Sequence, residues 1–230
     1  RRAERLSRQR MTETAKLVAL GEMAKGVGHE INNPMHVMLN EAGWALAPDE
    51  CMRIFIGKTV RSEAARIEAH TGQPLTDAWM AAFYARRNAL LEAELQPIEG
   101  AIEAVRAVHA RLGGRIACAS GADRYKVEMQ LQKVGLAPYF GANVFSGHEM
   151  PRTKPAPDVY LAAAAALGVP PQRCLVVEDT VTGVTAGVAA GATVVGYSPS
   201  LVGHGAPEAL LAAGAVRVIA HMSELPALLG

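Results

Sequence analysis

The chain has 230 residues, of which 50% are hydrophobic, 20% charged and 5% aromatic, and 23 Lys and Arg residues nearly balance 22 Asp and Glu residues. This composition predicts a globular, soluble protein with one ordinary domain and a smaller addition. The balanced charge argues against nucleic acid as a partner, and the lack of an apolar run of about 18 residues argues against a membrane span. Three isolated cysteines favour a reducing, cytoplasmic location.

The first predicted element is a long helix between Thr12 and Asn40. Its apolar residues are spaced alternately by three and four positions, at Leu17, Leu20, Ala24, Val27 and Ile31. This spacing is typical of a coiled-coil seam, so the helix either packs on its own protein or forms a homodimer. Pro34 should kink it. The run Met35 to Asn40 also fits a substitute strand, but we favour the end of a helix.

A motif within this helix carries a candidate phosphoacceptor. Residues 20–34 read Leu-Gly-Glu-Met-Ala-Lys-Gly-Val-Gly-His-Glu-Ile-Asn-Asn-Pro, which resembles the H-box of sensor histidine kinases. In that family the histidine, here His29, accepts phosphate on a dimerising helix, and Glu30 beside it would orient the ring or act as a base. The resemblance ends at about Asn40, and no ATP-binding domain follows. The chain is therefore not expected to phosphorylate itself. The alternative functions are a phosphoacceptor in a phosphorelay, through His29, and a non-catalytic dimerising module.

The next part, residues 42–96, carries little strand signal. Its runs Asp49 to Phe55, Ser62 to Thr71 and Asp77 to Leu95 predict three helices, separated by Gly57, Gly72 and Pro74. We expect a small helical domain.

From Pro97 onward the sequence alternates short apolar runs with helical patterns. The predicted strands are 115–119, 143–146, 174–177, 193–197 and 216–220, and the predicted helices are 100–111, 124–134, 157–167 and 183–190. Short apolar strands joined by helices indicate an α/β fold with a Rossmann-like parallel sheet covered on both faces.

Polar residues follow three of these strands, where ligands bind in such sheets. Ser120 and Gly121 offer a hydroxyl and an open amide, and Lys154 offers an ammonium between prolines. Glu178 and Asp179 are adjacent carboxylates that suit Mg²⁺. Each feature alone has a plainer interpretation as a turn, a solvated lysine or a helix cap.

The order of these features resembles the second, third and fourth motifs of the haloacid dehalogenase (HAD) superfamily over about residues 44–197. The stretches Lys-Pro-Ala-Pro-Asp-Val-Tyr from Lys154 and Val-Glu-Asp-Thr from Val177 are similar to its β-phosphoglucomutase-like branch. The resemblance implies a Mg²⁺-dependent phosphatase or phosphomutase acting on a small phosphorylated metabolite such as a sugar phosphate.

The same resemblance implies roles for individual residues. Ser120 and Gly121 would bind phosphate, Lys154 would stabilise the transferring phosphoryl group, and Asp179, helped by Glu178, would bind Mg²⁺. The loop Gly57-Lys58-Thr59 lies where the family's helical cap domain places substrate-selecting residues.

The family's first motif, an apolar strand ending in Asp-x-Asp-Gly-Thr, is not found. Its first aspartate is the nucleophile, so the resemblance implies impaired catalysis. We expect a sheet without its central strand and three parts: a kinase-like helix (1–41), a helical cap (42–96) and a HAD-like core (97–230). The switch between two families suggests a chimera, through a natural fusion, recombination or faulty gene assembly, and these remain open.

Overall fold

The computed structural model describes residues 17–20, 24–25, 27–55, 60–199 and 205–229. They belong to two compact units. We call residues 24–96 the helical unit, and the first strand together with residues 97–230 the sheet unit.

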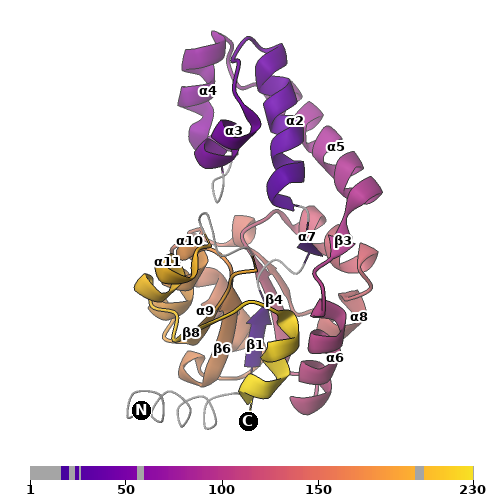
Figure 1. The fold of residues 1–230 in the computed structure, drawn as a ribbon, viewed down its shortest axis with the longest axis vertical. Helices are drawn as coiled ribbons and strands as arrows, with labels where there is room; N and C mark the ends of the chain where they lie inside the picture. Colours follow the sequence, from indigo (N-terminus) through magenta and orange to yellow (C-terminus); the bar gives the residue numbers. More distant parts are fainter. Residues whose placement is uncertain (1–16, 21–23, 26, 56–59, 200–204, 230) are drawn as a thin grey trace. The chain divides into compact units, whose positions relative to one another are not determined.

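The sheet unit contains six parallel strands in the order β5-β4-β1-β6-β7-β8 (Figure 1). They are β1 (Leu17–Leu20), β4 (Ile116–Ser120), β5 (Val144–Ser146), β6 (Cys174–Glu178), β7 (Thr193–Tyr197) and β8 (Arg217–Ile219). Every residue of β4 and β6 is buried, as expected for a parallel sheet covered on both faces. The predicted Rossmann-like α/β fold is confirmed.

Helices cover the two faces of this sheet. On one face α9 (Asp158–Ala166), α10 (Val181–Ala189) and α11 (Pro207–Ala212) pack against alternate strand residues, including Ala117, Val176 and Val194. On the other side lie α6 (Ala101–Arg111) and the 3₁₀ segment η4 (Met222–Leu229), which contact each other (Figure 1). The remaining elements are α7 (Arg124–Lys133), α8 (Ala137–Phe140), η2 (Gly147–Glu149) and η3 (Pro171–Arg173).

The start of the chain differs from the expected continuous helix over residues 12–40. Leu17–Leu20 forms β1, with Leu20 beside Cys118 of β4 and Val177 of β6. The expectation of a sheet without its central strand is therefore wrong. An empty position between β4 and β6 would leave buried N–H and C=O groups unpaired, at about 1–3 kcal/mol each. Intrinsic helix propensity is a weaker preference, since ordinary residues differ in it by at most about 0.7 kcal/mol each.

The helical unit begins earlier than expected. It contains α2 (Val27–Glu41), α3 (Pro48–Phe55), η1 (Val60–Glu63), α4 (Ala64–Thr71) and α5 (Asp77–Glu94). Helix α2 contacts α3 and α5, and its buried Met35 and Leu39 join Trp44 and Phe83 in one apolar core. The helical interpretation of Met35 to Asn40 is confirmed. The expected boundary between residues 41 and 42 is wrong, because α2 supplies part of this core.

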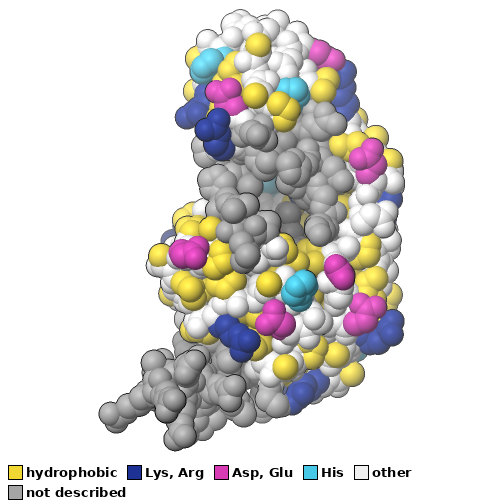
Figure 2. All heavy atoms as spheres, in the orientation of Figure 1, with side chains coloured by type: hydrophobic (Ala, Val, Ile, Leu, Met, Phe, Trp, Pro, Cys, Tyr) yellow, Lys and Arg dark blue, Asp and Glu magenta, His cyan; other side chains and the backbone are white. Residues whose placement is uncertain are grey.

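Two short strands, β2 (Ala24–Lys25) and β3 (Gln96–Pro97), form a separate two-stranded sheet. Among the described residues, no helix combines the length and apolar character needed to cross a bilayer. Side chains of both charges are interspersed on the face drawn in Figure 2.

Candidate functional site

Two strand ends on either side of β1 carry the polar residues predicted from the sequence. Ser120 is the last residue of β4 and Glu178 the last residue of β6, and β1 pairs with both strands. Because all three strands are parallel, their carboxyl ends lie at one edge of the sheet, where ligands of such folds bind.

Ser120 is held within a tight turn that leads into α7. Its side chain is 2% exposed, and its Oγ accepts a hydrogen bond of 3.1 Å from the Ala122 amide. A hydroxyl that accepts in this way still has its proton to donate. Gly121 is exposed, and Asp123 caps α7 by accepting from the Lys126 amide at 3.0 Å.

Lys154 connects the ends of the two strands that flank β1. Its Nζ donates to the Ala119 carbonyl of β4 at 3.3 Å and to the Glu178 carboxylate of β6. The side chain is 11% exposed, and the Lys154–Pro155 peptide is cis. The ammonium also lies 4.8 Å from the centre of the Tyr160 ring. These contacts place a positive charge at the carboxyl end of the sheet.

Glu178 is a buried, fully engaged carboxylate. It is 3% exposed and accepts from Lys154 and the Tyr160 hydroxyl on one oxygen, and from the Thr180 hydroxyl and Asp179 amide, each at 3.2 Å, on the other. Burial alone would raise the pKa of Glu178, but the Lys154 ammonium and these hydrogen bonds hold it below its ordinary value. Glu178 therefore stays ionised and fixes the ammonium.

Two neighbours determine how Glu178 fits. Burial and the Glu178 charge raise the pKa of Tyr160 well above its ordinary value, so its hydroxyl remains a donor. A Cβ at Gly183 in α10 would collide with the Glu178 carboxylate. The carboxylate thus occupies space that only glycine leaves open.

The residues available for a cation are fewer than the sequence suggested. Both Glu178 oxygens already accept hydrogen bonds, so in this structure Glu178 holds Lys154 instead of presenting an open coordination position. Asp179 is partly exposed at the end of β6. Among the described residues no group of three His, Cys, Asp or Glu side chains could hold a metal ion. One carboxylate still fits Mg²⁺, which takes one or two carboxylates together with waters and substrate phosphate.

The structure brings Ser120, Lys154, Glu178 and Asp179 to one edge of the sheet. The predicted loop Gly57-Lys58-Thr59 lies outside the described residues, and so does the side chain of His29, whose backbone belongs to α2. The contacts of Tyr160 and Thr180 with Glu178 were not predicted. Thr180 carried a signal, because a threonine three residues before Gly183 has helix-cap spacing, and it does accept from the Gly183 amide at 3.1 Å.

Two curated proteins are similar to parts of this chain. The 6-phosphogluconate phosphatase of Escherichia coli (strain K12) is 28% identical over 192 residues, which are 83% of this chain and 83% of that enzyme. The chloroplastic protein SUPPRESSOR OF QUENCHING 1 of Arabidopsis thaliana is 45% identical over 78 residues, which are 34% of this chain but only 7% of that protein.

A solved structure is similar to this chain over almost its full length. A HAD family hydrolase from Deinococcus radiodurans R1, crystallised with bound phosphate and sodium, is 29% identical with a TM-score of 0.74, covering 94% of this chain and 98% of that one. The family model for haloacid dehalogenase-like hydrolases matches residues 5–191. The chain therefore belongs to the haloacid dehalogenase-like hydrolase family.

Proposed function

We propose that the sheet unit binds the phosphate group of a small sugar phosphate as a HAD-type phosphatase or phosphomutase would, and that it turns the ester over poorly. One observation carries this proposal. The Ser120 hydroxyl and the Glu178 carboxylate stand at the carboxyl ends of the two strands that flank β1, and the Lys154 ammonium bonds to both of these strands.

Ser120 and Lys154 supply complementary interactions for a phosphate dianion. The Ser120 hydroxyl and the exposed Gly121 amide can donate hydrogen bonds to the phosphate oxygens. The Lys154 ammonium, which is largely shielded from water, can offset the negative charge of the phosphate. Phosphate competes with Glu178 for the Lys154 ammonium, and this competition limits the affinity for phosphate. The positive charge of the ammonium favours dianionic ligands over neutral sugars.

Asp179 is the residue that would hold Mg²⁺. A bound Mg²⁺ would neutralise part of the phosphate charge and complete its coordination with phosphate oxygens and water. Asp179, at the strand end, fixes where that cation sits, while Glu178 keeps Lys154 in place.

Poor turnover follows from the sequence after β1. The family's nucleophilic aspartate directly follows its first strand, whereas Leu20 is followed here by Gly21, Glu22 and Met23. Gly21 and Met23, which stand at the two aspartate positions of the family motif, have no carboxylate, and Glu22 stands at the intervening position, out of step with that motif. The sugar-phosphate class is supported by the relationship to 6-phosphogluconate phosphatase.

Calorimetric titration tests the binding part. The wild-type chain with Mg²⁺ should bind inorganic phosphate and 6-phosphogluconate but not gluconate. Ser120→Ala and Lys154→Met should each weaken binding about tenfold or more. Lys133→Met, which removes an exposed lysine at the far end of α7, should bind like the wild type.

Two outcomes contradict the proposal. One is a wild-type chain that binds neither phosphate ligand. The other is equal phosphate affinity in Ser120→Ala and the wild type, a comparison that stays valid even if Lys154→Met unfolds the protein.

A further inference from the structure

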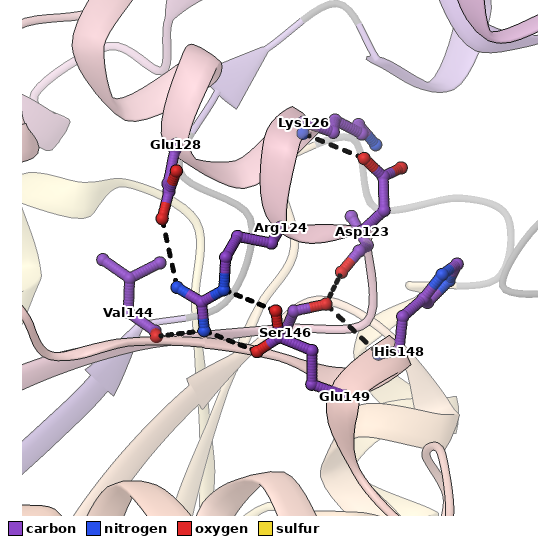
Figure 3. Close-up of polar contacts among 9 residues, drawn as sticks. Asp123, Arg124, Lys126, Glu128, Val144, Ser146, His148 and Glu149 are labelled. Carbon is purple, nitrogen blue, oxygen red and sulfur yellow. Dashed lines mark hydrogen bonds and ion pairs between the residues drawn. The ribbon is translucent and has the colours of Figure 1, made fainter.

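The turn that carries Ser120 is contacted by residues of β5, η2 and α7 to which the proposed function assigns no role. We call residues 120–122 the serine turn. We call the set of Ser146, Gly147 and Glu149, together with its partner Arg124, the η2 brace. Figure 3 shows the brace between the start of α7 and η2.

The first contact fixes the end of the serine turn. Ser146 is fully buried and pairs in register with Ser120 across the sheet. Its Oγ donates to the Ala122 carbonyl at 2.7 Å. The same Oγ accepts from the His148 amide at 3.2 Å (Figure 3). The bond to Ala122 ties the end of the turn to the last residue of β5.

The second contact is between backbones. A Cβ at Gly147 would lie 3.2 Å from the Gly121 Cα and 3.2 Å from the Ser120 carbonyl oxygen. The start of η2 therefore packs directly on the serine turn, and any larger residue at position 147 would displace it.

The third contact fixes the start of α7, two residues beyond the turn. The Arg124 guanidinium donates through Nε and Nη2 to the two Glu149 oxygens, each at 2.5 Å, and through Nη2 to the Val144 carbonyl at 3.2 Å (Figure 3). Such two-point arginine–carboxylate pairs are stronger and more directional than single contacts. Arg124 also binds Glu128 at 3.1 Å, but that bond stays within α7.

We infer that the η2 brace is the positioning device of the phosphate site: it holds the serine turn in the conformation that presents the Ser120 hydroxyl and the Gly121 amide. This inference rests on the proposed phosphate binding. Both ends of the turn are fixed to β5 and η2, so its donors are ordered before a ligand arrives. Preordered donors bind more tightly because less conformational freedom is lost on binding.

Three variants test the brace. Ser146→Ala removes the bond to Ala122, and Glu149→Gln weakens the pair with Arg124. Glu128→Gln is the matched control, since it changes the same kind of carboxylate on the same arginine without linking α7 to η2. Two properties are measured: hydrogen exchange of the Ala122 amide, which donates to Ser120 Oγ, and phosphate affinity by titration. Thermal unfolding confirms that each variant is folded.

The brace predicts faster exchange at Ala122 in Ser146→Ala and Glu149→Gln, with phosphate affinity lowered about five- to tenfold. Glu128→Gln should match the wild type in both. Unchanged exchange in the first two variants overturns the inference, as does an equal effect of Glu128→Gln and Glu149→Gln. A wild-type chain without phosphate affinity refutes the proposed function instead, and the exchange comparison then still decides whether the brace holds the turn.

Discussion

The Lys154 side chain is 11% exposed and its Nζ pairs with a single carboxylate. The Glu178 carboxylate offsets the charge of the ammonium, and the hydroxyls of Tyr160 and Thr180 donate further hydrogen bonds to that carboxylate. Breaking a buried pair by removing one charge is costly because the other charge stays behind without compensation. The pair therefore serves both stability and the placement of the ammonium.

Replacing Glu178 with glutamine should lower the free energy of unfolding by about 3–5 kcal/mol. The reason is that the Lys154 ammonium would lose the carboxylate that offsets its burial. Urea denaturation measures the change. Glu128→Gln, whose half-exposed side chain forms a pair within α7, should change it by at most about 1 kcal/mol. Equal changes in the free energy of unfolding for the two substitutions would show that the buried pair contributes no more to stability than the exposed one.

The residues of the site were predictable to different degrees. Ser120, Lys154 and Asp179 stand at or after strand ends in an order that resembles the family's motifs, so the sequence predicted their place at the sheet edge although each feature alone is ambiguous. The contacts of Tyr160 with Glu178 and of Ser146 with Ala122 join residues 18 and 24 positions apart. No local pattern marks such pairs, because they exist only once the sheet has formed.

At the scale of elements, β1 shows where local periodicity misleads. Leu17 and Leu20 fit a helical seam equally well by spacing, yet they lie in the central strand, paired on both sides. The helices 48–55, 64–71 and 77–94 and the strands from Ile116 onward match their predictions closely. Their neighbours along the chain determine them, whereas β1 is determined by β4 and β6, about 100 residues or more away.

Hydrogen exchange tests the position of β1. The amides of residues 18–20 should exchange as slowly as those of β6, since a strand bonded on both sides opens only when the sheet unfolds. Mass spectrometry or NMR under native conditions measures both. Exchange at residues 18–20 many times faster than in β6 would contradict the pairing of β1 and restore the helical interpretation.

At the scale of the molecule, the sheet has its central strand, but the sequence after β1 lacks the Asp-x-Asp motif on which the proposed chemistry depends. The sheet unit supplies Ser120, Lys154 and Asp179, and β1 ends where the nucleophile is expected. Gly21 and Met23 carry no carboxylate, and Glu22 stands between them, at neither aspartate position of the family motif. We therefore expect a phosphate ester to bind without efficient attack on phosphorus.

Restoring the two carboxylates tests this most directly. The double variant Gly21→Asp with Met23→Asp is compared with the wild type and with Gly21→Asn with Met23→Asn, by measuring Mg²⁺-dependent phosphate release from 6-phosphogluconate. The account predicts background rates for the wild type and the asparagine variant, and at least about a hundredfold increase for the aspartate variant. A wild-type chain as fast as the aspartate variant, or an aspartate variant that stays at background while binding phosphate, would contradict it.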